Sequence, residues 1–205
     1  MILAIDSSIG TSVALSDGDG NVLASASESG HLSHAEVIGS LIERVLGDAG
    51  SGPAEVSAVA CGMGPGPFTG LRIGIAAARA FAVGRGVPVV PIMSHDAIAT
   101  RALDEDPERD LVVVTDARRR EVAWSRYAGR TPSGAPIRID GPLLAVRETF
   151  AVGDADRLDA VDVPAEGIAF LAALTVRGDR DADPDEPVYL RAPDVTLSTR
   201  KRVSQ

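Results

Sequence analysis

Cysteine is nearly absent from this sequence, because Cys61 is the only one in 205 residues. A single cysteine cannot form an intramolecular disulfide, so we expect a reducing, cytoplasmic compartment. Cys61 ends the apolar run of residues 56–61, and no base lies next to it in the sequence. Such a thiol is a buried small hydrophobe more often than a nucleophile. We therefore predict that Cys61 is part of the core.

Aromatic residues, net positive charge and long apolar segments are also lacking. Aromatics make up 3% of a chain that is 45% hydrophobic, so the core must be aliphatic. The formal net charge is −9, which argues against a chain that binds nucleic acid by itself, since Lys and Arg neutralise phosphates in such complexes. The most apolar helical segment contains Arg72 and Arg79 and is too short to span a bilayer, so we expect no membrane association.

Histidine is scarce as well, with only His31, His34 and His95. His31 and His34 are three residues apart and could bring two metal ligands together, but no nearby Cys or carboxylate completes a set. The residue types of a serine hydrolase triad exist, yet the Gly-x-Ser-x-Gly motif does not. We predict neither a metal site nor a catalytic residue.

The order of predicted elements indicates an α/β chain. Residues 2–27 read as a three-stranded antiparallel meander with a turn at 17–21. A helix follows over 33–47, where Ser33 and Glu36 fit a capping box. A strand at 56–61, a helix at 71–83, a short strand at 87–91 and a helix at 94–103 complete the first half.

The second half begins with an echo of the first. Residues 111–116 form an apolar strand that ends in Asp, and a short turn and a returning strand follow, as at the N-terminus. A helix is predicted over 164–176. The charged segment 104–110 is broken by a proline. We therefore predict two lobes, an N-terminal one over 1–103 and a smaller C-terminal one over 104–205 with a polar tail.

Residues 61–72 contain four glycines and two prolines between a strand and a helix. Proline fixes φ near −65° and glycine permits conformations that a Cβ forbids, so we predict a rigid, sharply turned connector. Thr69 is predicted to cap the helix. The free N–H groups of the first turn make an anion site one interpretation, and a tight turn without a ligand is the other.

The end of the first strand is a second candidate for phosphate binding. There an Asp could hold a magnesium-bound water while hydroxyls face phosphate, although Asp and Ser are also ordinary turn formers. A two-lobed nucleotide enzyme needs a matching hairpin in its other lobe, but three arginines, residues 118–120, follow Asp116 there. The weak cofactor-binding candidates are Asp6, Ser7, Ser8 and Thr69, and we predict no catalysis.

The helix over 71–83 consists mostly of small residues and suits close packing against another chain. Arg72 and Arg79 are seven residues apart and share a face. The preceding helix carries an apolar row, part of which must pack on the sheet of the same chain. We predict a partner interface made of Val37, Ile38, Leu41, Leu71, Arg72, Ile75, Ala78 and Arg79.

Three sequence motifs resemble the TsaB (YeaZ) family. They are Leu-Ala-Ile-Asp-Ser-Ser at 3–8, Leu-Ser-His-Ala-Glu at 32–36 and Gly-Pro-Gly-Pro-Phe-Thr-Gly-Leu-Arg-Ile-Gly at 64–74. Residues 116–118 and 187–191 are similar to weaker motifs of the family's second half. The family's loop usually has Ser where Pro67 stands here, which should stiffen the loop and removes a hydroxyl.

The resemblance implies an α/β fold with two ribonuclease-H-like lobes of the actin, sugar-kinase and Hsp70 type, the second lobe reduced. It implies a non-catalytic subunit of the complex that forms threonylcarbamoyladenosine on tRNA. The partners would be the transferase TsaD, bound through helices of the first lobe, and the ATPase TsaE. A homodimer is expected when the chain is alone, and tRNA contact only through the complex. No cofactor is implied, although ATP or ADP is a candidate ligand at the interface with TsaD.

Two other functions are kept as alternatives. The first is a stand-alone nucleotide-binding enzyme of the sugar-kinase-like group, which requires tight binding of ATP and magnesium. The second is a metal-dependent, glycoprotease-like peptidase, for which the residues supply no evident water-activating site.

Overall fold

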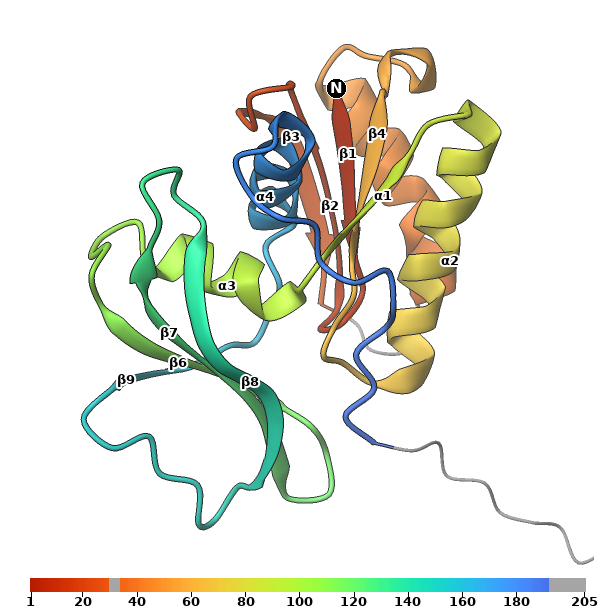
Figure 1. Ribbon diagram of the computed structural model, residues 1–205. Coiled ribbons are helices and arrows are strands. Elements are labelled where there is room, and N and C mark those ends of the chain that lie inside the picture. Colours follow the sequence, from red (N-terminus) through yellow and green to blue (C-terminus); the bar gives the residue numbers. More distant parts are fainter. Residues whose placement is uncertain (30–33, 192–205) are drawn as a thin grey trace, which may run out of the picture.

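The computed structural model describes residues 1–29 and 34–191, which form two β-sheets with helices packed around them (Figure 1). The first sheet has five strands in the order β3-β2-β1-β4-β5. Strands β1 to β3 are antiparallel, while β4 and β5 run parallel to β1. The predicted meander and strands are confirmed as β1 (Ile2–Asp6), β2 (Thr11–Ser16), β3 (Val22–Glu28), β4 (Ala58–Gly62) and β5 (Val89–Ile92).

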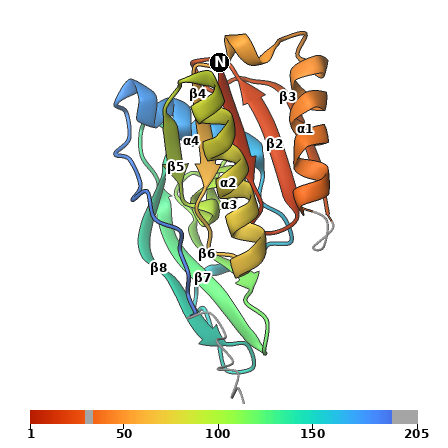
Figure 2. The same cartoon turned by 90° about the vertical axis from the view of Figure 1, so that its right-hand side faces the viewer.

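Helices cover both faces of this sheet. Successive strand residues point to opposite faces, so Leu3 and Ile5 pack toward α1 and α2, while Ile2 and Ala4 pack toward α4. This is why β1 is a continuous apolar run. Figure 2 shows α1 and α2 side by side over one face. The helices are α1 (His34–Asp48), α2 (Phe68–Arg85), α3 (Ser94–Ala102) and α4 (Ala165–Arg177), with a short 3₁₀ turn at Pro53–Glu55.

The second sheet repeats the plan of the first. Its order is β8-β7-β6-β9, with β6 antiparallel to β7 and parallel to β9, as β1 is to β2 and β4. Among the described residues it has no counterpart of β5, and residues 147–155 contain no helix. The predicted duplication and the smaller second lobe agree with this topology. The strands are β6 (Asp110–Asp116), β7 (Glu121–Arg130), β8 (Pro136–Val146) and β9 (Asp156–Asp159).

The predicted lobe boundary at residue 104 needs one correction. Helix α4 follows the boundary in sequence but packs on the first sheet, on the face opposite α2 (Figure 1). Ile168 and Leu171 are fully buried there, in one cluster with Ile2. Because α4 is apolar on nearly every side, it needs the uncovered face of that sheet. The first lobe is therefore discontinuous in sequence.

The segment after α4, which we call the C-terminal strap (residues 178–191), has no regular secondary structure. It begins at Gly178, which is in the left-handed conformation with φ +82° and ends the helix. The strap then runs from α4 to the end of β4, where the N–H of Val188 donates to the carbonyl of Met63 at 2.8 Å. No helix in the described part of the chain has the length and apolarity needed to cross a membrane.

Candidate functional site

Glycines occur at every fourth position from 62 to 74, and each lies against the turn between β1 and β2. A Cβ on Gly62 would lie 1.8 Å from Oδ2 of Asp6. A Cβ on Gly66 would lie 2.8 Å from Cα of Ser8, which is backbone and cannot rotate away. The glycine spacing is therefore explained by close backbone packing on this turn.

The next two glycines enclose Ser7. A Cβ on Gly70 would lie 3.0 Å from the Ser7 carbonyl oxygen, and one on Gly74 would lie 2.1 Å from Ser7 Oγ. That hydroxyl donates to the carbonyl of Gly70 at 2.7 Å and accepts from the N–H of Gly74 at 3.0 Å. Through these two hydrogen bonds, Ser7 links the end of β1 to the first turns of α2.

The Asp6 carboxylate is equally enclosed, with 1% of the residue exposed. It accepts hydrogen bonds from the N–H and hydroxyl of Ser8, at 2.7 and 3.1 Å, and from the hydroxyl of Ser94. Burial raises the pKa of Asp6, and the hydrogen bonds from Ser94 and Ser8 partly oppose this. Ser94, at the start of α3, also exchanges two hydrogen bonds with Gly64 and was not predicted from the sequence.

The prediction that Asp6 and Ser7 face a phosphate is therefore wrong for this structure. Their polar atoms are buried and bonded within the chain, because the glycines of residues 62–74 bring backbone where a ligand would lie. Thr69 is not the helix cap either. The helix starts earlier, with Pro67 at the N-cap, and the N–H of Leu71 donates to the carbonyl of Pro67. Ser33 and the predicted capping box lie outside the described residues.

Asp6→Asn tests this buried carboxylate through the pH dependence of stability. Since the folded-state pKa of Asp6 lies above its unfolded value, the folded chain binds this proton more tightly. The contribution of Asp6 to stability therefore falls as pH rises from about 4 toward the folded pKa. We expect the stability of Asp6→Asn relative to wild type to improve over that range, measured by urea unfolding at a series of pH values. An unchanged or opposite trend contradicts a buried Asp6 carboxylate with a raised pKa.

A cavity of about 670 Å³, which we call the lobe cleft, lies between the connector of residues 61–72 (the Gly-Pro loop), the turn between β6 and β7, and the strap. Thr69 and Ser8 line it, although the Ser8 hydroxyl is bonded to Asp6 and Ser94. Residues 116–119 line it from the second lobe, and 189–191 from the strap. Segments that are far apart in the sequence, including both weaker motifs, therefore meet at one cavity.

The turn between β6 and β7 has an uncommon backbone. Arg118, Arg119 and Arg120 have φ values of 61°, 53° and 62°, in the left-handed region that L-residues rarely adopt. Hydrogen bonds hold this conformation, among them Glu121 N–H to the Arg118 carbonyl at 3.0 Å and Arg147 N–H to the Arg120 carbonyl at 2.8 Å. The sequence predicts a turn here, but not this conformation.

Arg72 joins the strap to α2 at one edge of the cleft. Its guanidinium carbon lies 3.6 Å from the ring centroid of Phe68, and its Nε donates to the hydroxyl of Tyr189 at 2.9 Å. The rings of Phe68 and Tyr189 are 4.9 Å apart. Further along α2, Arg79 forms an ion pair with Asp185 of the strap at 2.9 Å. Both arginines of the predicted interface thus contact their own chain.

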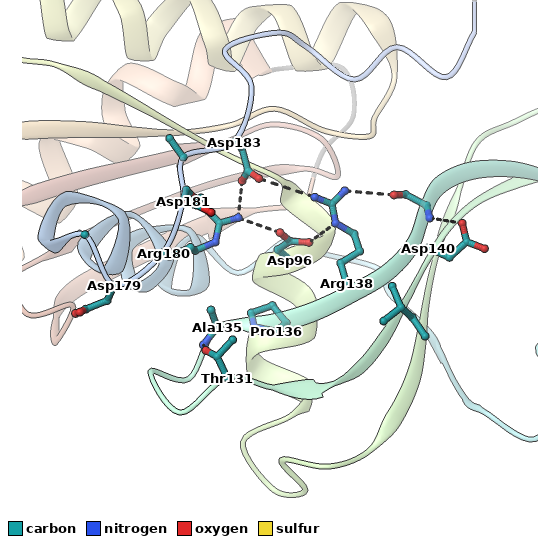
Figure 3. A pocket seen from close by; sticks show the side chains of 14 residues that line it. Asp96, Thr131, Ala135, Pro136, Arg138, Asp140, Asp179, Arg180, Asp181 and Asp183 are labelled. Carbon is teal, nitrogen blue, oxygen red and sulfur yellow. Dashed lines mark hydrogen bonds and ion pairs between the residues drawn. The ribbon is translucent and has the colours of Figure 1, made fainter.

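A buried ion-pair network ties the strap to α3 and β8 (Figure 3). Asp96, which is 3% exposed, lies 3.1 Å from Arg180 and 3.2 Å from Arg138, and the Tyr127 hydroxyl donates to it at 2.9 Å. Asp183 is 2.7 Å from Arg180. Burial raises the pKa of Asp96, while Arg138 most strongly opposes the rise. The network borders an open cavity of about 840 Å³.

Five predicted interface residues belong to the chain's own core, and their assignment to a contact surface is corrected. They lie on the sheet-facing sides of α1 and α2 and are at most 7% exposed: Ile38, Leu41, Leu71, Ile75 and Ala78. Val37 is half-buried. The exposed side of the two helices, which we call the α1–α2 surface, carries the small residues Gly39, Ser40, Gly47, Ala76, Ala80 and Gly84 together with Val83. Charged residues lie among them: Glu36, Glu43, Arg44, Asp48, Arg72 and Arg79.

The residues considered for catalysis or metal binding are placed as follows. His95 is fully buried, with its ring nitrogens 2.8 Å from Ser125 Oγ and 3.0 Å from Thr115 Oγ1, and burial, aided by the charge of Arg138, lowers its pKa to about 3. His34 Nδ1 lies 2.8 Å from the hydroxyl of Thr11, and His31 is outside the described residues. The described residues group no three candidate metal ligands.

Cys61 is confirmed as a core residue. It is 1% exposed and packs in the cluster beneath α1 and α2. Burial raises the pKa of the thiol, and the nearby Asp6 carboxylate adds to the rise. The reactive thiolate is therefore disfavoured.

Comparison with known families gives a match over more than half of the chain. The family model described as "TsaD: tRNA N6-adenosine threonylcarbamoyltransferase" matches residues 22–135. The chain is 39% identical over 167 residues to an uncharacterized protein of Mycobacterium tuberculosis, covering 78% of this chain and 76% of that protein. It is 38% identical over 93 residues to the tRNA threonylcarbamoyladenosine biosynthesis protein TsaB of Haemophilus influenzae, covering 45% of this chain and 39% of the relative.

Solved structures agree with these relatives. YeaZ from Pseudomonas aeruginosa superposes with a TM-score of 0.77 at 28% identity, covering 92% of this chain and 99% of that one. Another structure from the same organism, described as similar to peptidase YEAZ, has the same TM-score. The predicted α/β fold with two lobes is thereby confirmed. The chain belongs to the TsaB (YeaZ) family, and it matches the TsaD family model over residues 22–135.

Proposed function

We propose that the chain is a non-catalytic subunit in the formation of threonylcarbamoyladenosine on tRNA, where it pairs with a TsaD-type transferase and is joined by TsaE. The TsaB name of its relatives supports the pathway. The observation that carries the non-catalytic role is that the backbone of residues 62–74 packs against the turn between β1 and β2, where a ligand would lie. A phosphate at that turn would need exposed hydroxyl and N–H groups, but Asp6, Ser7 and Ser8 are at most 2% exposed.

The α1–α2 surface supports the proposed pairing. Two neighbouring helices present it over one face of the first sheet (Figure 2). A Cβ on Gly39 or Gly84 would meet no atom within 4 Å, so nothing in the single chain requires glycine there. Glycine inside a helix costs up to about 1 kcal/mol relative to alanine. Small residues let a partner helix approach closely, and the same surface would serve a homodimer when TsaD is absent.

The remaining features of the proposal follow from this pairing. With a net charge of −9, the chain would contact tRNA only through the complex. An adenine nucleotide, where one is present, would lie at the interface with TsaD and not at the turn between β1 and β2. The place of action would be the cytoplasm, in keeping with a single buried thiol.

Ala80→Glu tests the proposed interface. Ala80 is exposed on α2, so the charge disturbs no core contact of the single chain, but it would be buried without a partner in the complex. We expect association with the TsaD-type transferase to weaken at least about tenfold, measured by calorimetry with the purified proteins.

The matched control is Val161→Glu. Val161 is 84% exposed and lies in the loop between β9 and α4, away from the α1–α2 surface. This variant should bind as wild type does. If both variants bind like wild type, the partner uses a different surface. Ala78→Glu is unsuitable because Ala78 is fully buried and the variant would unfold the chain.

A further inference from the structure

The lobe cleft carries positive charge in an otherwise acidic protein. Its lining holds Arg118, Arg119 and Arg191, of which Arg191 is ion-paired with Glu121, and one carboxylate, Asp116, which is ion-paired with Arg147. The chain as a whole has a formal net charge of −9. A cleft with low-dielectric walls strengthens the field of the charges that line it. The cavity thus differs in sign from its surroundings and favours an anion.

Arg118 is the residue best placed to bind an anion in the lobe cleft. It is exposed, and no carboxylate in residues 1–29 or 34–191 forms an ion pair with its guanidinium. Its backbone is held, because its carbonyl accepts from Glu121 N–H at 3.0 Å and from Arg191 Nη2 at 3.4 Å. A guanidinium offers a planar fork of N–H donors that matches phosphate and carboxylate oxygens.

Apolar side chains form the other part of the cleft wall. Phe68 and Ile73 contribute from α2, Leu144 from β8, and Leu190 from the strap. The volume of about 670 Å³ lies within the range of small-molecule sites, roughly 300 to 1,000 Å³. An inorganic anion would leave most of this wall without a contact.

We propose that the lobe cleft binds a small organic anion, in which a phosphate or carboxylate is joined to an apolar or planar body. The anionic group would lie against Arg118, and the body would lie between the Gly-Pro loop and the strap. The site adjoins the turn between β1 and β2, because Ser8 lines the cleft, but Asp6 and Ser7 of that turn do not line it. It goes beyond the proposed function because it needs only this chain and no partner.

Calorimetry on the purified full chain tests the proposal with three probes. Phenyl phosphate carries both parts, inorganic phosphate only the anion, and phenol only the ring. We expect saturable one-to-one binding of phenyl phosphate, weaker binding of inorganic phosphate and no binding of phenol, with affinity falling as salt is raised. Absence of phenyl phosphate binding overturns the proposal, and so does equal binding of phenyl phosphate and inorganic phosphate.

Variants locate the binding. Arg118→Gln should weaken phenyl phosphate binding about tenfold, since it removes a charged hydrogen-bond donor. Arg120→Gln is the matched control, because Arg120 is in the same turn but does not line the cleft, and its affinity should be unchanged.

Thr69→Glu supplies a second test in which the fold is retained. Thr69 is exposed in the first turn of α2, where an acidic side chain is favourable for the helix. The new charge should abolish binding of the anion. If Arg118→Gln and Thr69→Glu both bind phenyl phosphate as wild type does, the cleft is not the site. Association with TsaD is read separately, so the failure of one proposal leaves the other standing.

Discussion

Gly74→Ala is expected to destabilise the chain by about 3 kcal/mol, since it combines overpacking with the loss of buried hydrogen bonds. The new Cβ would lie 2.1 Å from Ser7 Oγ. Ser7 cannot rotate away without losing its bonds to the carbonyl of Gly70 and the N–H of Gly74. Urea unfolding followed by circular dichroism measures the effect as a lowered midpoint.

Gly84→Ala is the matched control on the same helix. No atom lies within 4 Å of the place where its Cβ would be, so we expect unchanged or slightly increased stability, by up to about 1 kcal/mol. Ser7→Gly removes the hydroxyl that the Gly74 methyl would meet. The double variant Ser7→Gly/Gly74→Ala should therefore lose less stability than the sum of the two single variants. Additive losses would show that Ser7 and Gly74 do not pack as described.

Arg180→Ala is expected to destabilise the chain by about 3 kcal/mol, because it leaves two buried carboxylates to share Arg138. The side chains of Asp96, Asp183 and Arg180 are 5%, 10% and 12% exposed, so solvent compensates little. Protonation of Asp96 relieves the uncompensated charge. The deficit should therefore be larger at neutral pH than in mild acid, where an aspartate of raised pKa takes up a proton.

Arg177→Ala is the control for this network. Arg177 lies three residues earlier and also pairs with two aspartates, Asp19 and Asp179, but its side chain is 35% exposed. Exposed ion pairs contribute about 0 to 1 kcal/mol, so a small effect is expected. Equal losses in Arg177→Ala and Arg180→Ala would contradict the view that burial makes the network important.

The two lobes could be predicted because their strands are simple. The strand at 2–6 is covered on both faces, so it is apolar throughout, and the strand at 111–114 follows the same rule in the second lobe. Both strands end in Asp and are followed by a short turn, and this shared pattern allowed the duplication to be predicted. Helix α4 was predicted as an element, but its sequence does not say which sheet it covers.

Strand β8 could not be predicted because the start of the strand exposes its apolar residues and turns a charged residue inward, which reverses the usual alternation. Ile137 and Ile139 are 41% and 55% exposed, while Arg138 between them points toward Asp96 (Figure 3). The usual assumption that apolar residues face the core fails when a charged residue is buried with a partner. Asp96 and Arg138 are 42 positions apart in the sequence, so their pairing leaves no local signal.

The candidate site was predicted only in part. The Gly-Pro loop was expected to be a rigid, sharply turned connector, and the structure adds the reason for its glycines, which is contact with the turn at Asp6, Ser7 and Ser8. That contact joins segments about 60 residues apart, so glycine spacing alone did not reveal it. The apolar row on α1 pointed to burial, but a row of apolar residues does not tell core from interface.

Reconstituted modification of tRNA tests the central claim most directly. The TsaD-type transferase and TsaE would be assayed for threonylcarbamoyladenosine with and without this chain, and the chain would also be assayed alone. We predict no product from the chain alone, little from TsaD and TsaE, and restored formation when the chain is added. Full activity of TsaD and TsaE without the chain, or product formed by the chain alone, would contradict the account.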